Sequence, residues 1–285
     1  MKLKQFWRND RIQLGIETSK GVIDVTAEAL HRGISAPGTM LEVICGGETA
    51  MQVLRQLSLD ARCFAEAPAA PAVTGSNKIL CIGLNYRQHA IERGLPFPAA
   101  PVLFSKYPNA LCADGDNIRL LPEYTEYDYE AELVAVIGKT ARNVCAEDAL
   151  DYVFGYTCGN DLSTRDLQKT RGGQWVLSKS LDGFAPVGPC VTTSDEIDPT
   201  DLRIRCRVNG ELRQDSSTSD MIYSVAQIIE DLSRHMTLAP GDLIFTGSPQ
   251  GVIQGYPTDK RQWLKPGDQM DVTIENIGTL HNTLY

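Results

Sequence analysis

Four acidic residues alternate with other residues within a short segment: Glu126, Asp128, Glu130 and Glu132. The segment runs directly into residues 133–137, whose apolar and β-branched side chains are typical of a buried strand. If that strand extends back, its period of two places all four carboxylates on one face. Like charges on one face repel unless a cation compensates them. The pattern therefore favours a binding site for a hard divalent cation, Mg²⁺, Mn²⁺ or Ca²⁺. The alternative is an outer face of the strand exposed to solvent.

A further oxygen ligand is expected from a second segment, at the end of a glycine-bounded apolar strand. Asp161 and Asp166 lie there, just before and within a helical stretch predicted over 162–168. An aspartate in this position can equally well be a helix cap or a residue of the first turn of the helix. The spacing alone leaves ligand and cap as open alternatives for both residues.

The sequence has four histidines, and the context of each indicates where it is expected to lie. His31, His235 and His281 lie in polar or terminal contexts and are expected at the surface. His89 precedes Glu92 by three positions, which places both on one face of a helical turn. A neutral imidazole can take a proton from water near pH 7 while the carboxylate fixes its tautomer. An exposed ion pair without catalytic function is the alternative.

The composition restricts the class of partner. Among 285 residues, 36 Asp and Glu outnumber 27 Lys and Arg, which gives a formal net charge of −9. Nucleic acid and anionic membranes attract basic surfaces, so neither is expected as a partner. No apolar run suggests a signal peptide or a membrane span. The eight cysteines are scattered without a C-x-x-C pair, so we expect reduced thiols in a cytoplasmic protein rather than disulfides or a zinc site.

The first 72 residues are predicted to form a small N-terminal α+β module. A helix is expected over 49–57, because its apolar residues recur at helical spacing. The Ala/Pro-rich stretch 65–72 has the character of a linker and sets the boundary with a second domain, 73–285. Three short strands are expected near residues 6–7, 12–16 and 22–25.

The second domain is strand-rich. Asn209-Gly210 between the alternating run 203–208 and residues 211–213 predicts a β-hairpin. Strands are also expected at 243–245 and 270–274, each after a Pro-Gly turn, and an amphipathic helix over 222–236. Strands joined mainly by turns favour an α+β fold with antiparallel or mixed sheet.

Several blocks of the second domain, in collinear order, resemble the fumarylacetoacetate hydrolase family. The resemblance covers about residues 78–285 and implies a mixed β-sandwich roll that usually forms homodimers. Here the small N-terminal α+β module precedes the roll. The blocks are residues 82–89, 129–138, 155–166, 177–180, 182–189, 208–211 and 246–252.

The resemblance implies a role for particular residues. Two glutamates and one aspartate of the family hold Mg²⁺ or a similar ion, and they match Glu130, Glu132 and Asp161. His89 and Glu92 match the family's water-activating dyad. Lys179 matches an active-site lysine that could donate a proton or add positive charge; a solvated lysine is the alternative.

Four residues are weaker candidates for binding a substrate. Arg165 and Gln168 are expected to orient it, although Arg165 could simply balance the acids. Gly247 and Ser248 begin a loop whose backbone N–H groups could meet a substrate carboxylate; a plain turn is the alternative. The loop lacks the G-K-[ST] ending of a nucleotide-binding P-loop. Residues 94–101 are expected to be part of a mobile lid.

The function expected first is a divalent-metal-dependent hydrolase that cleaves a carbon–carbon bond of a small acylpyruvate or 2,4-dioxo acid. In this mechanism the His89–Glu92 dyad activates water. The alternative, within the same family, is a decarboxylase or an isomerase or tautomerase of an oxaloacetate-like or hydroxymuconate-like acid, or a lyase such as a ureidoglycolate lyase. The expected partner is a small keto acid substrate. A metal that only stabilises the fold is the non-enzymatic alternative.

Overall fold

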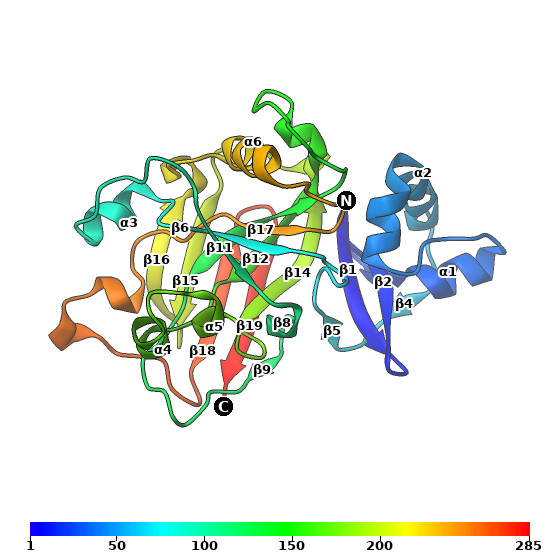
Figure 1. Ribbon diagram of the computed structural model, residues 1–285. Helices are drawn as coiled ribbons and strands as arrows, with labels where there is room; N and C mark the ends of the chain where they lie inside the picture. The colour runs from blue at the N-terminus through cyan, green and yellow to red at the C-terminus, as the bar shows by residue number, and fades with distance from the viewer.

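The computed structural model describes residues 1–285 and is built around one large mixed sheet (Figure 1). The sheet has twelve strands. Ten of them follow one another in the order β4 (Phe64–Ala65), β3 (Gly21–Asp24), β2 (Arg11–Thr18), β1 (Lys2–Arg8), β14 (Ala185–Thr193), β12 (Val153–Asn160), β11 (Ala131–Ile137), β17 (Leu243–Phe245), β6 (Ile79–Gly83) and β7 (Val102–Lys106). The other two are β5 (Ala69–Ala70), paired with β1, and β8 (Leu111–Cys112), paired with β14.

A second sheet packs against one face of the first. Its five strands have the order β16 (Glu211–Ser217), β15 (Arg203–Val208), β18 (Gln269–Ile274), β19 (Gly278–Leu284) and β9 (Asn117–Ile118). A separate pair is formed by β10 (Tyr127–Asp128) and β13 (Ser163–Thr164). The predicted hairpin is confirmed: β15 and β16 meet at Asn209 and Gly210, which both have positive φ, as a type I′ turn requires.

Six helices lie around the sheets. The predicted amphipathic helix is confirmed as α6; Ser224 caps it in a capping box with Gln227. None of the helices has the length and apolar character needed to cross a membrane. The helices are α1 (Val25–Arg32), α2 (Met40–Ser58), α3 (Arg87–Glu92), α4 (Arg165–Thr170), α5 (Val176–Lys179) and α6 (Val225–His235). Short 3₁₀ turns occur at Pro108–Ala110, Ala149–Tyr152, Ser194–Glu196, Thr218–Asp220, Ile253–Gly255 and Thr258–Lys260.

Strand β11 separates two hydrophobic cores. Leu133, Ala135 and Ile137 point into the core between the two sheets, whereas Val134 and Val136 point into a second core. Both faces of the strand are therefore buried, as its continuous apolar sequence predicts. The strand-rich α+β fold expected from the sequence is confirmed.

The N-terminal residues extend the large sheet. The three predicted strands are present as β1 to β3, and β1 pairs with β14 (Figure 1). The predicted helix is longer than expected, since α2 begins at Met40 and contains a kink at Gly47. The stretch 65–72 is not a free linker, because β5 lies within it and pairs with β1. Sheet and core are thus continuous across the predicted boundary at residue 72.

Candidate metal centre and active site

Two neighbouring strands bring three carboxylates together. Glu130 immediately precedes β11, Glu132 is the second residue of β11, and Asp161 follows the end of β12. These strands are antiparallel and Ala131 pairs with Asn160, so the start of one lies beside the end of the other. One carboxylate oxygen from each of the three residues lies within 4.8 Å of the others. Glu130, Glu132 and Asp161 form what we call the acidic cluster.

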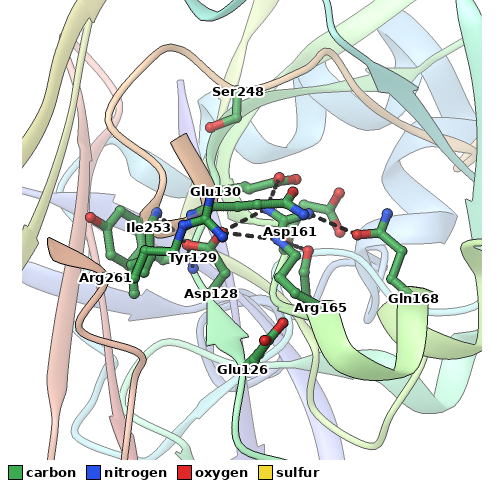
Figure 2. Close-up of polar contacts among 12 residues, drawn as sticks. Glu126, Asp128, Tyr129, Glu130, Asp161, Arg165, Gln168, Ser248, Ile253 and Arg261 are labelled. Carbon is green, nitrogen blue, oxygen red and sulfur yellow. Dashed lines mark hydrogen bonds and ion pairs between the residues drawn. The ribbon is translucent and has the colours of Figure 1, made fainter. Parts of the chain in front are cut away.

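The other predicted acids do not join the acidic cluster. Strand β10 ends at Asp128 and β11 begins at Ala131, so the strand does not extend back unbroken through the four acids, as the predicted shared face required. Glu126 forms an ion pair with Lys169 near the surface and lies apart from the cluster (Figure 2). Asp128 is buried and accepts hydrogen bonds from the backbone of Ile253 (2.8 Å). Asp166 lies in the first turn of α4 and accepts from Thr125 N at 2.8 Å, which fits the structural alternative.

Two cations neutralise part of the acidic cluster. Lys179 Nζ lies 2.8 Å from Glu130 Oε2 and 2.5 Å from Asp161 Oδ2. Arg165 lies between Asp128 and Glu130 and contacts both carboxylates (Figure 2). Burial alone would raise the pKa of Glu130, but Arg165 and Lys179 outweigh it and hold that pKa well below its usual range. Burial would likewise lower the pKa of Lys179, but Asp161 and Glu130 raise it, so the ammonium stays charged.

Glu132 has no cationic partner. Its Oε2 accepts a hydrogen bond from Gly247 N at 2.7 Å, and its side chain is buried. Burial, followed by the charges of Asp161 and Glu130, raises the pKa of Glu132 well above its usual range. The acidic cluster therefore contains one carboxylate whose charge the protein itself does not compensate.

Lys106 is a buried cation that sequence reasoning missed. Its Nζ lies 2.6 Å from Asp161 Oδ1, but donates its hydrogen bonds to the backbone oxygens of Leu162, Lys179 and Phe184. Asp161 Oδ1 consequently has an ionic neighbour but no hydrogen-bond donor. The available signal was a lysine within an otherwise strand-like run, because a charge on a buried strand needs a partner.

The acidic cluster fits a hard divalent cation. All its donors are carboxylate oxygens, the set that Mg²⁺, Mn²⁺ and Ca²⁺ prefer. Glu132, a buried carboxylate that no cationic side chain compensates, is a group that a bound cation would satisfy. Assignment of these residues as metal ligands remains a prediction, now with a geometric basis.

The predicted dyad is formed on the short helix α3. His89 Nδ1 lies 3.2 Å from Glu92 Oε2, and Glu92 also accepts from Gly251 N at 3.1 Å. His89 is largely buried and lines the same cavity as Glu130 and Glu132. The imidazole is therefore not exposed at the surface, although Glu92 beside it is partly exposed. His31, His235 and His281 are exposed, as expected.

The cavity at the acidic cluster has a volume of about 180 Å³. Of the predicted substrate-binding residues, Arg165, Gln168 and Ser248 line it, and Arg165 Nη1 donates to Gln168 Oε1 at 3.3 Å. Gly247 N is already bonded to Glu132, so it supports the acidic cluster. Sequence reasoning missed further lining residues that come from distant segments: Arg93, Phe104, Trp175 and Gln254.

Comparison with known proteins defines the class. Residues 78–285 match the family described as fumarylacetoacetate (FAA) hydrolase C-terminal. The chain belongs to the fumarylacetoacetate hydrolase family, as the resemblance indicated.

Its curated relatives include two oxaloacetate tautomerases. FAHD2B, the mitochondrial oxaloacetate tautomerase of Bos taurus, is 40% identical over 276 residues, which cover 94% of this chain and 86% of that protein. The oxaloacetate tautomerase YisK of Bacillus subtilis is 43% identical over 264 residues, which cover 87% of each.

Two solved structures extend the comparison. Fumarylacetoacetate hydrolase from Exiguobacterium antarcticum has a TM-score of 0.83 at 36% identity, covering 100% of this chain and 99% of the other. Maleylpyruvate hydrolase from Sphingobium, in complex with manganese(II) and pyruvate, has a TM-score of 0.80 at 29% identity, covering 100% and 98%. The family thus contains both hydrolases and tautomerases.

Proposed function

We propose that the chain is a divalent-metal-dependent tautomerase that interconverts the keto and enol forms of oxaloacetate or a closely similar 2-oxo acid. Relatives that are 40% and 43% identical are named oxaloacetate tautomerases. This supports the tautomerase alternative over the acylpyruvate hydrolase that was expected first. The geometry that carries the proposal is one small cavity lined by an imidazole, His89, and by two carboxylates of the acidic cluster, Glu130 and Glu132.

The proposed reaction moves one proton. Keto-to-enol conversion breaks the C3–H bond and forms an O2–H bond, with negative charge on the 2-oxo oxygen between the two events. His89 suits the C3 proton transfer, because hydrogen bonding of its Nδ1 to Glu92 leaves Nε2 free to accept. Glu92 then stabilises the imidazolium, which gives the proton to O2 and returns to the neutral imidazole. Lys179 keeps a positive charge beside the acidic cluster.

Glu130, Glu132 and Asp161 would hold the divalent ion. The chemistry it would supply is Lewis-acid polarisation of the 2-oxo group. Mg²⁺ is proposed as the physiological ion, and Mn²⁺ is supported by the manganese complex of the structural relative. Arg165 and Gln168, which line the cavity, would orient the substrate carboxylate. A homodimer, the assembly usual in the family, is part of the proposal.

The test follows the absorbance of enol-oxaloacetate after it is mixed with enzyme and Mg²⁺. Mg²⁺ and buffer without enzyme give the uncatalysed rate, and chelator-treated enzyme gives the metal-free rate. The proposal predicts rapid loss of enol absorbance that depends on both enzyme and metal, without formation of pyruvate.

A parallel assay separates the alternatives. Acetylpyruvate is offered under the same conditions, and acetate and pyruvate are measured. Stoichiometric acetate and pyruvate, at a turnover exceeding that of oxaloacetate tautomerisation, would establish a hydrolase and contradict the proposal. Pyruvate and CO₂ from oxaloacetate would instead establish a decarboxylase.

A further inference from the structure

The cavity contains one guanidinium that no acidic residue neutralises. Three permanently cationic side chains line the cavity: Arg93, Arg165 and Lys179. Arg165 is paired with Asp128 and Glu130, and Lys179 with the acidic cluster. Arg93 forms no ion pair, and its Nη1 donates a hydrogen bond to the neutral Gln254 Oε1 at 2.7 Å.

The position of Arg93 is fixed by the surrounding loop. It follows Glu92, the last residue of α3, and Glu92 is bonded to Gly251 N. Gln254, which holds Arg93, has its own backbone N–H bonded to Asp128 Oδ2 at 3.1 Å. Arg93 is half-buried, and burial together with the nearby Arg165 lowers its pKa. A guanidinium still remains protonated in proteins, so the cavity holds an uncompensated positive charge.

We propose that Arg93 binds the second carboxylate of the substrate and so selects dicarboxylic over monocarboxylic 2-oxo acids. A half-buried guanidinium with free N–H donors is suited to a carboxylate, which accepts two parallel hydrogen bonds from it. In the proposed function the 2-oxo acid end of the substrate binds at the acidic cluster. The carboxylate at the other end is then the group that Arg93 would bind. This inference rests on the proposed function and adds the residue that determines its substrate class.

The test compares two substrates that differ in one charge. Oxaloacetate and its 4-methyl ester share the 2-oxo acid end, but the ester lacks the far carboxylate. Arg93→Gln is expected to raise KM for oxaloacetate by about 10- to 100-fold, the range for a lost charged hydrogen bond, and to leave KM for the ester unchanged. Arg93→Lys is expected to retain part of the preference. Arg171→Gln, which removes an exposed arginine outside the cavity, is the matched control.

Binding of an inert analogue makes the test independent of turnover. Malate cannot tautomerise, and its affinity for the Mn²⁺-loaded protein is measured by calorimetry beside that of its 4-methyl ester. We expect Arg93→Gln to weaken malate binding and not ester binding, with an unchanged thermal unfolding midpoint. Equal effects on both ligands, or no effect on either, would overturn the role of Arg93. Selective loss of malate binding in a protein that does not tautomerise oxaloacetate would instead refute the proposed function alone.

Discussion

Lys106 Nζ and Asp161 Oδ1 lie 2.6 Å apart, and neither side chain is exposed to solvent. Replacing Lys106 by Met would leave Asp161 with Lys179 as its remaining ion-pair partner and would remove the donor from three buried backbone oxygens. We expect Lys106→Met to lower the free energy of unfolding by about 3–5 kcal/mol, measured by urea denaturation. Lys169→Met, which removes a half-exposed lysine paired with Glu126, is the control and should lose about 1 kcal/mol or less. Equal losses of unfolding free energy in the two variants would show that the buried Lys106–Asp161 contact stabilises the fold no more than a surface ion pair does.

His89 is expected to be the main proton acceptor of the reaction. His89→Gln should reduce kcat for oxaloacetate tautomerisation by about 10²- to 10⁴-fold, the usual contribution of a general base. Glu92→Gln should reduce it less, because the imidazole remains in place. His235→Gln changes an exposed histidine and should have no effect. Activity of His89→Gln within twofold of wild type would exclude His89 from the proton transfer.

Gly247 connects the loop after β17 to the acidic cluster. Its φ is +100°, and an added Cβ would lie 2.6 Å from Asn85 Cβ and 3.0 Å from Ile82 O. Gly247→Ala should therefore displace the backbone N–H that donates a hydrogen bond to Glu132, and so weaken Mn²⁺ binding. Gly115→Ala, at a φ of +84° with nothing within 4 Å of the added carbon, shares the backbone strain without the clash. The difference in Mn²⁺ affinity between the two variants, measured by calorimetry, isolates the effect of the clash. No difference would mean that the Gly247–Glu132 bond does not support the acidic cluster.

The raised pKa of Glu132 predicts a pH-dependent stability of the metal-free protein. The unfolded chain releases this proton near the ordinary pKa of 4.5, whereas the folded protein retains it to higher pH. Stability contributed by Glu132 is therefore lost as the pH rises from 4.5 through the raised pKa. Relative to Glu132→Gln, the wild type should become less stable over that interval, and added Mn²⁺ should reverse the loss. Urea denaturation at several pH values measures it; a pH-independent difference would contradict the raised pKa.

The local sequence pattern predicted the elements that are determined by residues close to them in the chain. The β15–β16 hairpin follows from Asn209-Gly210, and α6 from its apolar spacing and cap. The buried part of β11 follows from its composition. The break between β10 and β11 was not predictable, because the pairing of Asp128 with Ser163 and its bonds to a distant loop set it.

The candidate site depended more on long-range contacts. The family resemblance named Glu130, Glu132 and Asp161, and the pairing of β11 with β12 explains why they meet. The sequence did not predict Lys106 or Arg93 as site residues. Their partners, Asp161 and Gln254, lie 55 or more positions away in the chain. The composition of 65–72 is typical of a linker. Its pairing with β1 joins residues far apart in the chain and was therefore not predictable from that composition.

The most direct test of the metal centre compares Mn²⁺ binding to the wild type and to Glu132→Gln. Calorimetry measures the affinity and the number of ions bound. Glutamine keeps the shape of the side chain but removes the charge that the protein leaves uncompensated. Asp166→Asn, an acid at the start of α4 outside the acidic cluster, is the matched control. A metal centre at the acidic cluster predicts one ion per chain for wild type and control, and binding at least about tenfold weaker in Glu132→Gln. Equal affinity and stoichiometry in all three proteins would contradict a metal centre at Glu130, Glu132 and Asp161.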